Sequence, residues 1–220
     1  MGMTFDRNFF TQIGRDSGAL TMLTTVVHSF GEPGEYRAVA SNGDSQATFY
    51  ISVDKSCAVA AAQIDLANLT TPAADVTCCT GQGAPRFVVH PKGYAVFHVS
   101  GGSGGYWVTA RRADEDSNIK PYDTRELRDG DFFSAILLRP GTYSIKNTLS
   151  NAEARATVSY PSTGPAPYQP PEPLVIDVTA AIEPADIELR PMQGLNFNVH
   201  ASARIVIELM EPDDGPGARA

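Results

Sequence analysis

The stretch "PGEYRAVASN" (33–42) returns about a hundred residues later as "PGTYSIKNTLSN" (140–151). In both places an apolar stretch precedes Pro-Gly-x-Tyr, and Ser-Asn and a further apolar stretch follow it. Pro-Gly favours a tight turn, and a Tyr directly after the turn can bury its ring while its hydroxyl reaches a backbone carbonyl. We therefore predict that Tyr36 and Tyr143 are structural residues, each at a corner of a β-sandwich.

A second pair of matching segments lies elsewhere in the chain. "RFVVHPKGYAVFHV" (86–99) matches "DIELRPMQGLNFNV" (186–199), and Phe97 and Phe197 fall in step. Both Phe residues alternate with more polar neighbours, as expected for inward-facing positions of a strand. We predict that Phe97 and Phe197 are core residues.

The order of these matches predicts a repeat whose reading frame is rotated. The segment 63–160 holds one complete unit, whereas 1–54 and 174–211 each hold half a unit. Half a sandwich cannot bury its apolar face alone, so the two halves must meet. They could close into a discontinuous domain of one chain, with the Pro-rich segment 161–173 as the linker. Alternatively, they could be exchanged between chains in a dimer, ring or filament. The segment 212–220 is interpreted as a flexible tail.

Short alternating segments dominate the remainder of the chain and predict an all-β fold. The predicted strands are 47–53, 86–90, 95–99, 154–160 and 204–209. In "CAVAAAQIDLANL" (57–69), the Ala run is interpreted as a short helical turn or a connector, and "IDLANL" as a strand. Many short strands between Gly- and Pro-rich turns favour a sandwich or a barrel.

Three segments resemble immunoglobulin-like domains of the intermediate type. "GEYRAVASNGDSQATFYISV" (34–53) resembles the final hairpin of that family, "PKGYAVFHVSGGSGGYWV" (91–108) its second and third strands, and "GDFFSAILLRPGTYSIKN" (130–147) its fifth and sixth strands. The resemblance implies two immunoglobulin-like sandwiches, one of them discontinuous, with Trp107 as a core residue. The cysteines of the family's inter-sheet disulfide are absent. Fibronectin-type and cupredoxin-like sandwiches share the Pro-Gly-x-Tyr phrase.

The chain has 220 residues, a formal net charge of −8 and 42% hydrophobic residues. No basic stripe is present, which disfavours nucleic acid and anionic membrane surfaces as partners. No apolar run reaches the roughly 18 residues of a transmembrane helix, so membrane insertion is not expected. The start of the sequence lacks a signal-peptide pattern. We expect an intracellular protein or, if a leader is missing, part of a virion or a cell-surface structure.

The three cysteines are Cys57, Cys78 and Cys79. One disulfide from Cys57 to either member of the adjacent pair and three free thiols are both compatible with this spacing. No second Cys or His pair stands at zinc-ligand spacing.

Few residues suggest chemistry. The acidic segments 113–118 and 211–215 give weak calcium candidates, although their spacing matches no calcium-loop signature. These candidates are Asp114, Asp116, Asp213 and Asp214. A cupredoxin copper site needs a late Cys, and none follows Tyr143. "GGSGG" (101–105) lacks the strand-to-helix context of a nucleophile elbow and is interpreted as a turn. We predict no catalytic residues and no cofactor.

The leading hypothesis is therefore a non-enzymatic structural or interaction protein that self-assembles, by half-domain exchange, or decorates a larger assembly. Its partner would be another protein or a second copy of itself. The alternative is a carbohydrate- or protein-binding accessory module with an aromatic surface. The residues of that surface would be Tyr94, Tyr106, Trp107 and Tyr122. A cupredoxin-like metal protein is the third hypothesis.

Overall fold

The computed structural model describes residues 12–70, 83–114, 120–160 and 168–213. Over these residues the chain is all-β, and its strands form three sheets. The described part of the chain contains one α-helix, the short α2 at Leu66–Thr70. The predicted all-β class is confirmed. No helix in these ranges has the length and apolar character needed to cross a membrane.

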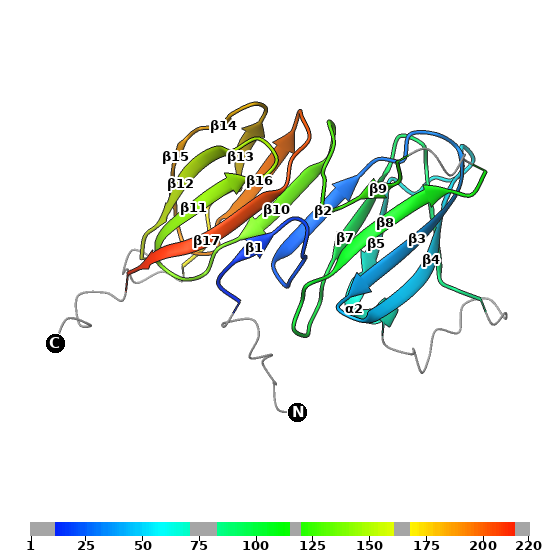
Figure 1. The fold of residues 1–220 in the computed structure, drawn as a ribbon, viewed down its shortest axis with the longest axis horizontal. Coiled ribbons are helices and arrows are strands. Elements are labelled where there is room, and N and C mark those ends of the chain that lie inside the picture. The colour runs from blue at the N-terminus through cyan, green and yellow to red at the C-terminus, as the bar shows by residue number, and fades with distance from the viewer. Residues whose placement is uncertain (1–11, 71–82, 115–119, 161–167, 214–220) are drawn as a thin grey trace.

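The largest sheet has seven strands and runs through the whole molecule (Figure 1). Its order is β14 (Ile182–Glu183), β13 (Leu174–Val178), β16 (Gly194–Val199), β10 (Phe132–Ile136), β2 (Thr24–His28), β7 (Tyr94–His98) and β5 (Ala61–Asp65). In its middle, β2 and β10 pair antiparallel, with Val26 opposite Phe133. This pair makes the two ends of the sheet one hydrogen-bonded layer.

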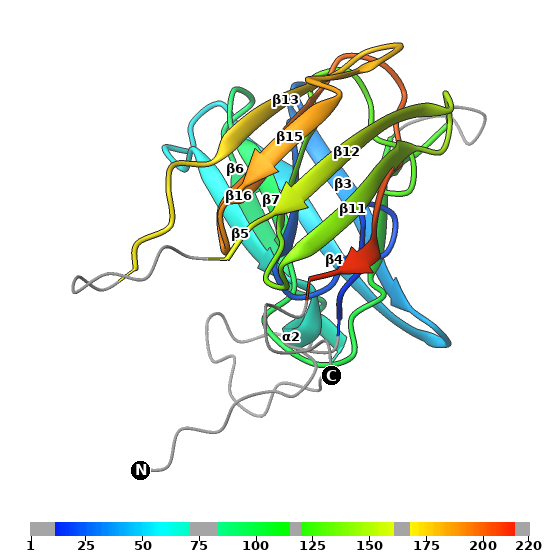
Figure 2. The ribbon, with the colours of Figure 1, turned by 90° about the vertical axis from the view of Figure 1, so that its left-hand side faces the viewer.

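Two five-stranded sheets cover the two ends of the seven-stranded sheet (Figures 1 and 2). One has the order β6 (Arg86–Val89), β4 (Ser45–Val53), β3 (Gly34–Asn42), β8 (Trp107–Arg112) and β9 (Tyr122–Asp123). The other has the order β1 (Arg15–Asp16), β17 (Ile205–Pro212), β11 (Gly141–Asn147), β12 (Ala152–Val158) and β15 (Asp186–Leu189). We call the half with β2 to β9 the first lobe and the half with β10 to β17 the second lobe.

Alternating burial along the strands builds the core between the sheets. Phe97 on β7 and Phe49 on β4 are fully buried, and their ring centroids lie 6.5 Å apart. The two sheets of the first lobe therefore meet through these rings. In the second lobe, Phe133 and Phe197 are fully buried and stack at 5.8 Å. Phe97 and Phe197 thus occupy the core positions expected for them.

The strand pairings of the two lobes correspond one by one. The hairpin of β3 and β4 corresponds to that of β11 and β12, and the β3–β8 pair corresponds to β11–β17. The parallel pairs β4–β6 and β5–β7 correspond to the parallel pairs β12–β15 and β13–β16. Each Pro-Gly-x-Tyr strand therefore lies in the middle of its own five-stranded sheet.

These pairings correct the predicted division of the chain. Strand β3, from the segment 1–54, pairs with β8, which was assigned to the continuous unit 63–160. Strand β11, from that same unit, pairs with β17 of the segment 174–211. The half units that are neighbours in sequence have combined, because a short connection keeps their ends close together. The sequence matches are the same for either combination, so they could not decide between them.

Two local predictions also change. Strand β5 begins inside the Ala run at Ala61, and the helix α2 follows it, so strand and helix are exchanged within 57–69. The Asp65 carboxylate accepts a hydrogen bond from the Ala67 N–H at 3.1 Å, which explains the start of the helix there. In the predicted linker and tail, 161–167 and 214–220 lie outside the described residues.

Candidate functional site

The two corner tyrosines donate hydrogen bonds to backbone carbonyls. The Tyr143 hydroxyl donates to the Arg139 carbonyl at 2.7 Å, and the Tyr36 hydroxyl donates to the Glu32 carbonyl at 3.1 Å. Tyr143 is 1% exposed, and burial raises the pKa of its hydroxyl. Both contacts are of the kind expected from the repeated phrase.

Trp107 does not lie in the core. The alternation of β8 turns Val108 and Ala110 inward, so Trp107 is on the opposite face and half-buried. The guanidinium carbon of Arg125 lies 5.4 Å from the centroid of its ring. The predicted core position for Trp107 is therefore corrected.

The aromatic residues of the alternative hypothesis do not share one exposed surface. Tyr106 and Tyr122 are 7% and 4% exposed, whereas Tyr94 is 41% exposed. A sugar-binding platform needs accessible ring faces, so these four residues do not supply one together.

The calcium candidates are separated or outside the described residues. Both carboxylate oxygens of Asp114 lie close to the Arg112 guanidinium, at 2.7 and 2.9 Å. Asp213 is exposed at the end of β17, and its N–H donates to the Pro140 carbonyl. Asp116 and Asp214 lie outside the described residues, as do Cys78 and Cys79, the predicted partners of the half-buried Cys57. Within the described ranges, no group of three or more His, Cys, Asp or Glu side chains is close enough to hold a metal ion.

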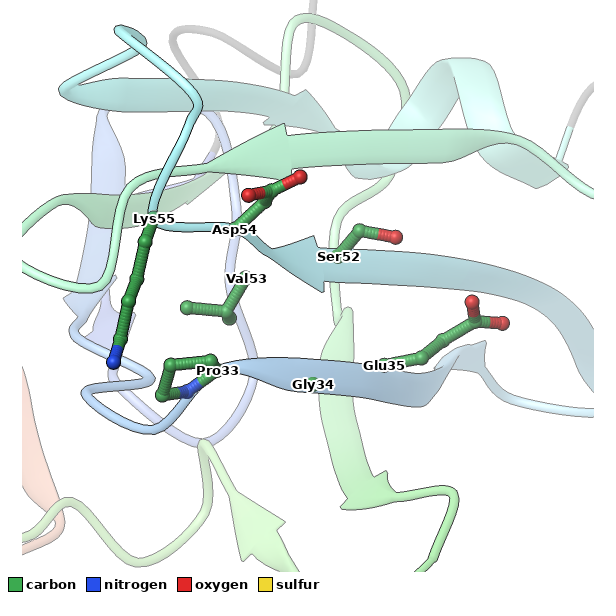
Figure 3. A pocket seen from close by; sticks show the side chains of 7 residues that line it. All are labelled: Pro33, Gly34, Glu35, Ser52, Val53, Asp54 and Lys55. Atoms are coloured by element: carbon green, nitrogen blue, oxygen red, sulfur yellow. The ribbon is translucent and has the colours of Figure 1, made fainter.

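A wide hollow of about 480 Å³ lies beside the first Pro-Gly corner (Figure 3). Its walls come from the start of β3 and the end of β4. The Asp54 carboxylate in this wall accepts hydrogen bonds from the N–H and hydroxyl of Ser56, and the backbone bond lowers the pKa of Asp54. The Glu35 carboxylate pairs with Arg86. The two carboxylates that line this hollow therefore already have partners within the fold.

The junction between the lobes holds a second set of contacts. We call residues 15–20 strap 1 and residues 122–127 strap 2. In strap 1, the Ser17 N–H donates to the Ile205 carbonyl at 2.9 Å, and the Ile205 N–H donates to the Ser17 hydroxyl at 3.1 Å. Leu20, at the end of this strap, forms a β-bridge to Tyr106. Strap 1 therefore begins on the second lobe and ends on the first.

Strap 2 makes the reciprocal contacts. Its Thr124 N–H donates to the Val108 carbonyl at 3.0 Å, and the Val108 N–H donates to the Thr124 hydroxyl at 3.0 Å. Leu127 then forms a β-bridge to Ala203. Strap 2 begins on the first lobe and ends on the second, so the two straps cross between the lobes in opposite directions.

An ion pair closes strap 1 onto the second lobe. Two guanidinium nitrogens of Arg204 donate to the two carboxylate oxygens of Asp16, at 3.1 and 2.8 Å. This bidentate contact raises the pKa of Arg204. Gly18 lies beside it, and a Cβ at this position would be 2.8 Å from Arg204 Nε.

A His–Asp pair links β2 to the start of β10. His28 Nδ1 lies 2.5 Å from a carboxylate oxygen of Asp131, which is 1% exposed. The other oxygen accepts a hydrogen bond from the Arg128 N–H at 2.8 Å. Because a carboxylate accepts and does not donate, Nδ1 carries the proton, and Nε2 remains available to another group.

Tyr122 covers this pair. Its ring stacks on the His28 ring with centroids 3.8 Å apart. Its hydroxyl is buried and has no hydrogen-bond partner among the described residues. Burial raises the pKa of the Tyr122 hydroxyl, and the Asp131 carboxylate raises it further.

His28, Tyr122 and Arg128 line a cleft of about 270 Å³, which we call the junction cleft. Its other residues are Ser29, Phe30, Gly31, Glu32, Tyr36, Ala110, Arg112 and Lys120. The Arg128 guanidinium donates to the carbonyls of Lys120 and Pro121, at 3.2 and 2.5 Å. The cleft thus combines an aromatic wall with donors and positive charge.

The junction cleft was missed by sequence reasoning. His28 and Asp131 are 103 positions apart, and neither belongs to a chemical motif. Asp131 ends the short turn "RDGD" (128–131), which matches no catalytic or ligand-binding signature. Nothing local in the sequence indicates that β2 and β10 are neighbours.

Comparisons of the chain with protein-family models, curated proteins and solved structures found no match.

Proposed function

We propose that this protein is a non-enzymatic structural or interaction protein, built from two tandem copies of one immunoglobulin-like sandwich, that joins a larger protein assembly or associates with copies of itself. The observation that carries the proposal is the reciprocal crossing of the two straps at the junction. Crossed straps and a shared sheet hold two lobes in one fixed arrangement, which suits a building block with two binding faces.

The strand neighbours support the immunoglobulin-like part of the proposal. In that family the third, sixth and seventh strands share one sheet. Here β8, β3 and β4 occupy these places in the first lobe, and β17, β11 and β12 occupy them in the second. The chain order within each lobe is rotated relative to the family. The parallel pairs β5–β7 and β13–β16 also depart from its antiparallel sheets.

The outer strands of the long sheet support a protein partner. β5 and β13 correspond to each other in the pairing scheme and lie near opposite ends of this sheet. β14 covers β13 only at Asp177 and Val178, and Val175 on the same strand is 58% exposed. A strand edge that no described strand covers, with an exposed apolar side chain, can accept a strand of another molecule.

Light scattering coupled to gel filtration tests this proposal. The average molecular mass is measured at protein concentrations from micromolar to millimolar. We expect the average mass to rise with concentration. We also expect Val175→Lys to weaken the rise, because a charge on this edge opposes strand addition. Val59→Lys, at a site that is 45% exposed and lies outside the strands, is the matched control. A mass that stays at that of one chain over the whole range would contradict self-association.

A further inference from the structure

Tyr122 lines the junction cleft, and its buried hydroxyl is a feature that the fold itself does not explain. Tyr122 is 4% exposed, and its hydroxyl finds no hydrogen-bond partner in the described part of the chain. A buried hydroxyl without a partner lowers stability, because it has lost its hydrogen bonds to water. Such a group persists more readily where a ligand supplies the missing partner.

The charges around the cleft indicate what kind of partner would fit. The Arg112 and Lys120 side chains pair with carboxylates, those of Glu32 and Glu126. Arg128 differs from them, because its guanidinium donates only to backbone carbonyls and forms no ion pair with a described carboxylate. A cation without a counter-charge favours a negatively charged ligand.

His28 adds a further polar group to the same cleft. Its Nδ1 is bound to Asp131, so its second ring nitrogen can meet a ligand. The carboxylate oxygens of Asp131 each have a donor already and are 1% exposed. Both oxygens of Asp131 are therefore already engaged within the fold.

We propose that the junction cleft binds an oxyanion, the carboxylate or phosphate group of a small molecule, through Tyr122, His28 and Arg128. The volume of about 270 Å³ lies just below the range of drug-sized ligand sites, so the ligand is small. The rings of Phe30 and Tyr36 line the same cleft and suit a flat apolar portion of the ligand. This site is independent of the proposed association through strand edges.

Calorimetric titration of the full chain with inorganic phosphate and, separately, with benzoate tests the proposal. We expect one molecule of at least one probe to bind per chain. Tighter binding of phosphate identifies a phosphate site, and tighter binding of benzoate identifies a carboxylate site. Failure of both probes to bind at millimolar concentration overturns the proposal.

Tyr122→Phe is the decisive variant, since it removes only the unpartnered hydroxyl. We expect a melting temperature equal to or above that of the parent without ligand, together with a loss of affinity of about tenfold or more. Tyr143→Phe is the matched control, since its hydroxyl is bonded to Arg139 on the other lobe. It should lower the melting temperature and leave the affinity unchanged. Unchanged affinity in Tyr122→Phe, or a lowered melting temperature, would overturn the assignment.

Discussion

At the scale of single residues, the two corner tyrosines make the same kind of contact in different surroundings. Tyr143 is 1% exposed and its bond to Arg139 is 2.7 Å long, whereas Tyr36 is half-buried and its bond to Glu32 is 3.1 Å long. When a buried hydroxyl is removed, the carbonyl that accepted its hydrogen bond is left without a donor. At a half-buried site, water replaces the lost hydrogen bond more easily. The two residues should therefore differ in their contribution to stability.

We expect Tyr143→Phe to lower the free energy of unfolding by about 1 to 2 kcal/mol, and Tyr36→Phe to lower it by less. Urea unfolding followed by circular dichroism measures both values. A larger loss in Tyr36→Phe than in Tyr143→Phe would contradict the link between burial and the strength of the corner bond.

Asp131 accepts a hydrogen bond within its own turn and also pairs with His28. Comparison with Thr24, which accepts the same kind of turn hydrogen bond, separates these two roles. The Thr24 hydroxyl accepts a hydrogen bond from the Thr21 N–H at 2.9 Å, just as Asp131 accepts one from the Arg128 N–H. Asp131→Thr should keep this turn contact and remove the partner of His28, whereas Asp131→Ala should remove both. We expect Asp131→Ala to be less stable than Asp131→Thr by about 1 kcal/mol in urea unfolding. If both variants lost the same free energy of unfolding, the turn hydrogen bond would contribute nothing to stability.

The sequence could predict the corner tyrosines because their turn, ring and hydroxyl contact all lie within one short phrase. The hydroxyl of Tyr143 reaches back only to Arg139. The pair of His28 and Asp131 had no such local signal, because it forms only when β2 and β10 become neighbours. Trp107 was misplaced because the resemblance, and not the alternation along β8, was used to place it.

At the scale of elements, the turns before β2 and β10 show where each lobe begins. Leu23 and Gly130 both have positive φ, at 66° and 87°. Each directly precedes the residue that accepts the turn hydrogen bond, Thr24 in one lobe and Asp131 in the other. The sequence hides this correspondence, because Gly at one turn is replaced by Leu at the other. Matching residue types therefore identify the repeated strands and the Gly and Pro residues around them. They do not identify the turns before β2 and β10, where the repeated unit begins.

Gly130→Ala tests the cost of this backbone conformation. A Cβ at Gly130 would meet no atom within 4 Å, so its cost comes from the positive φ alone. We expect a loss of about 1 kcal/mol in the free energy of unfolding. Gly31→Ala is the control, since that site is equally open and carries no positive φ. A loss as large in Gly31→Ala would exclude backbone strain as the cause.

At the scale of the whole molecule, the crossed straps decide how the lobes depend on each other. Strap 1 covers the edge of β17 through β1, and strap 2 covers the edge of β8 through β9. Each lobe thus receives an edge strand from the segment that leads into the first strand of the other. The repeated phrases could predict two similar units, but the halves that combine are chosen by chain connectivity and by these straps.

Removing the residues of strap 1 that contact the second lobe should uncouple the lobes. A chain that begins at Gly18 lacks β1 and the ion pair of Asp16 with Arg204, but all strands of the first lobe remain. We expect the second lobe to unfold at lower urea, since β17 then has an uncovered edge and Arg204 has lost its partner. Fluorescence of Trp107, the single Trp, reports on the first lobe, and far-ultraviolet circular dichroism reports on both lobes. The two curves should coincide in the full chain and in a chain that begins at Gln12. In the chain that begins at Gly18, the circular dichroism signal should begin to fall at lower urea than the Trp107 fluorescence. Two curves that still coincide at the midpoint of the full chain would show that strap 1 does not support the second lobe.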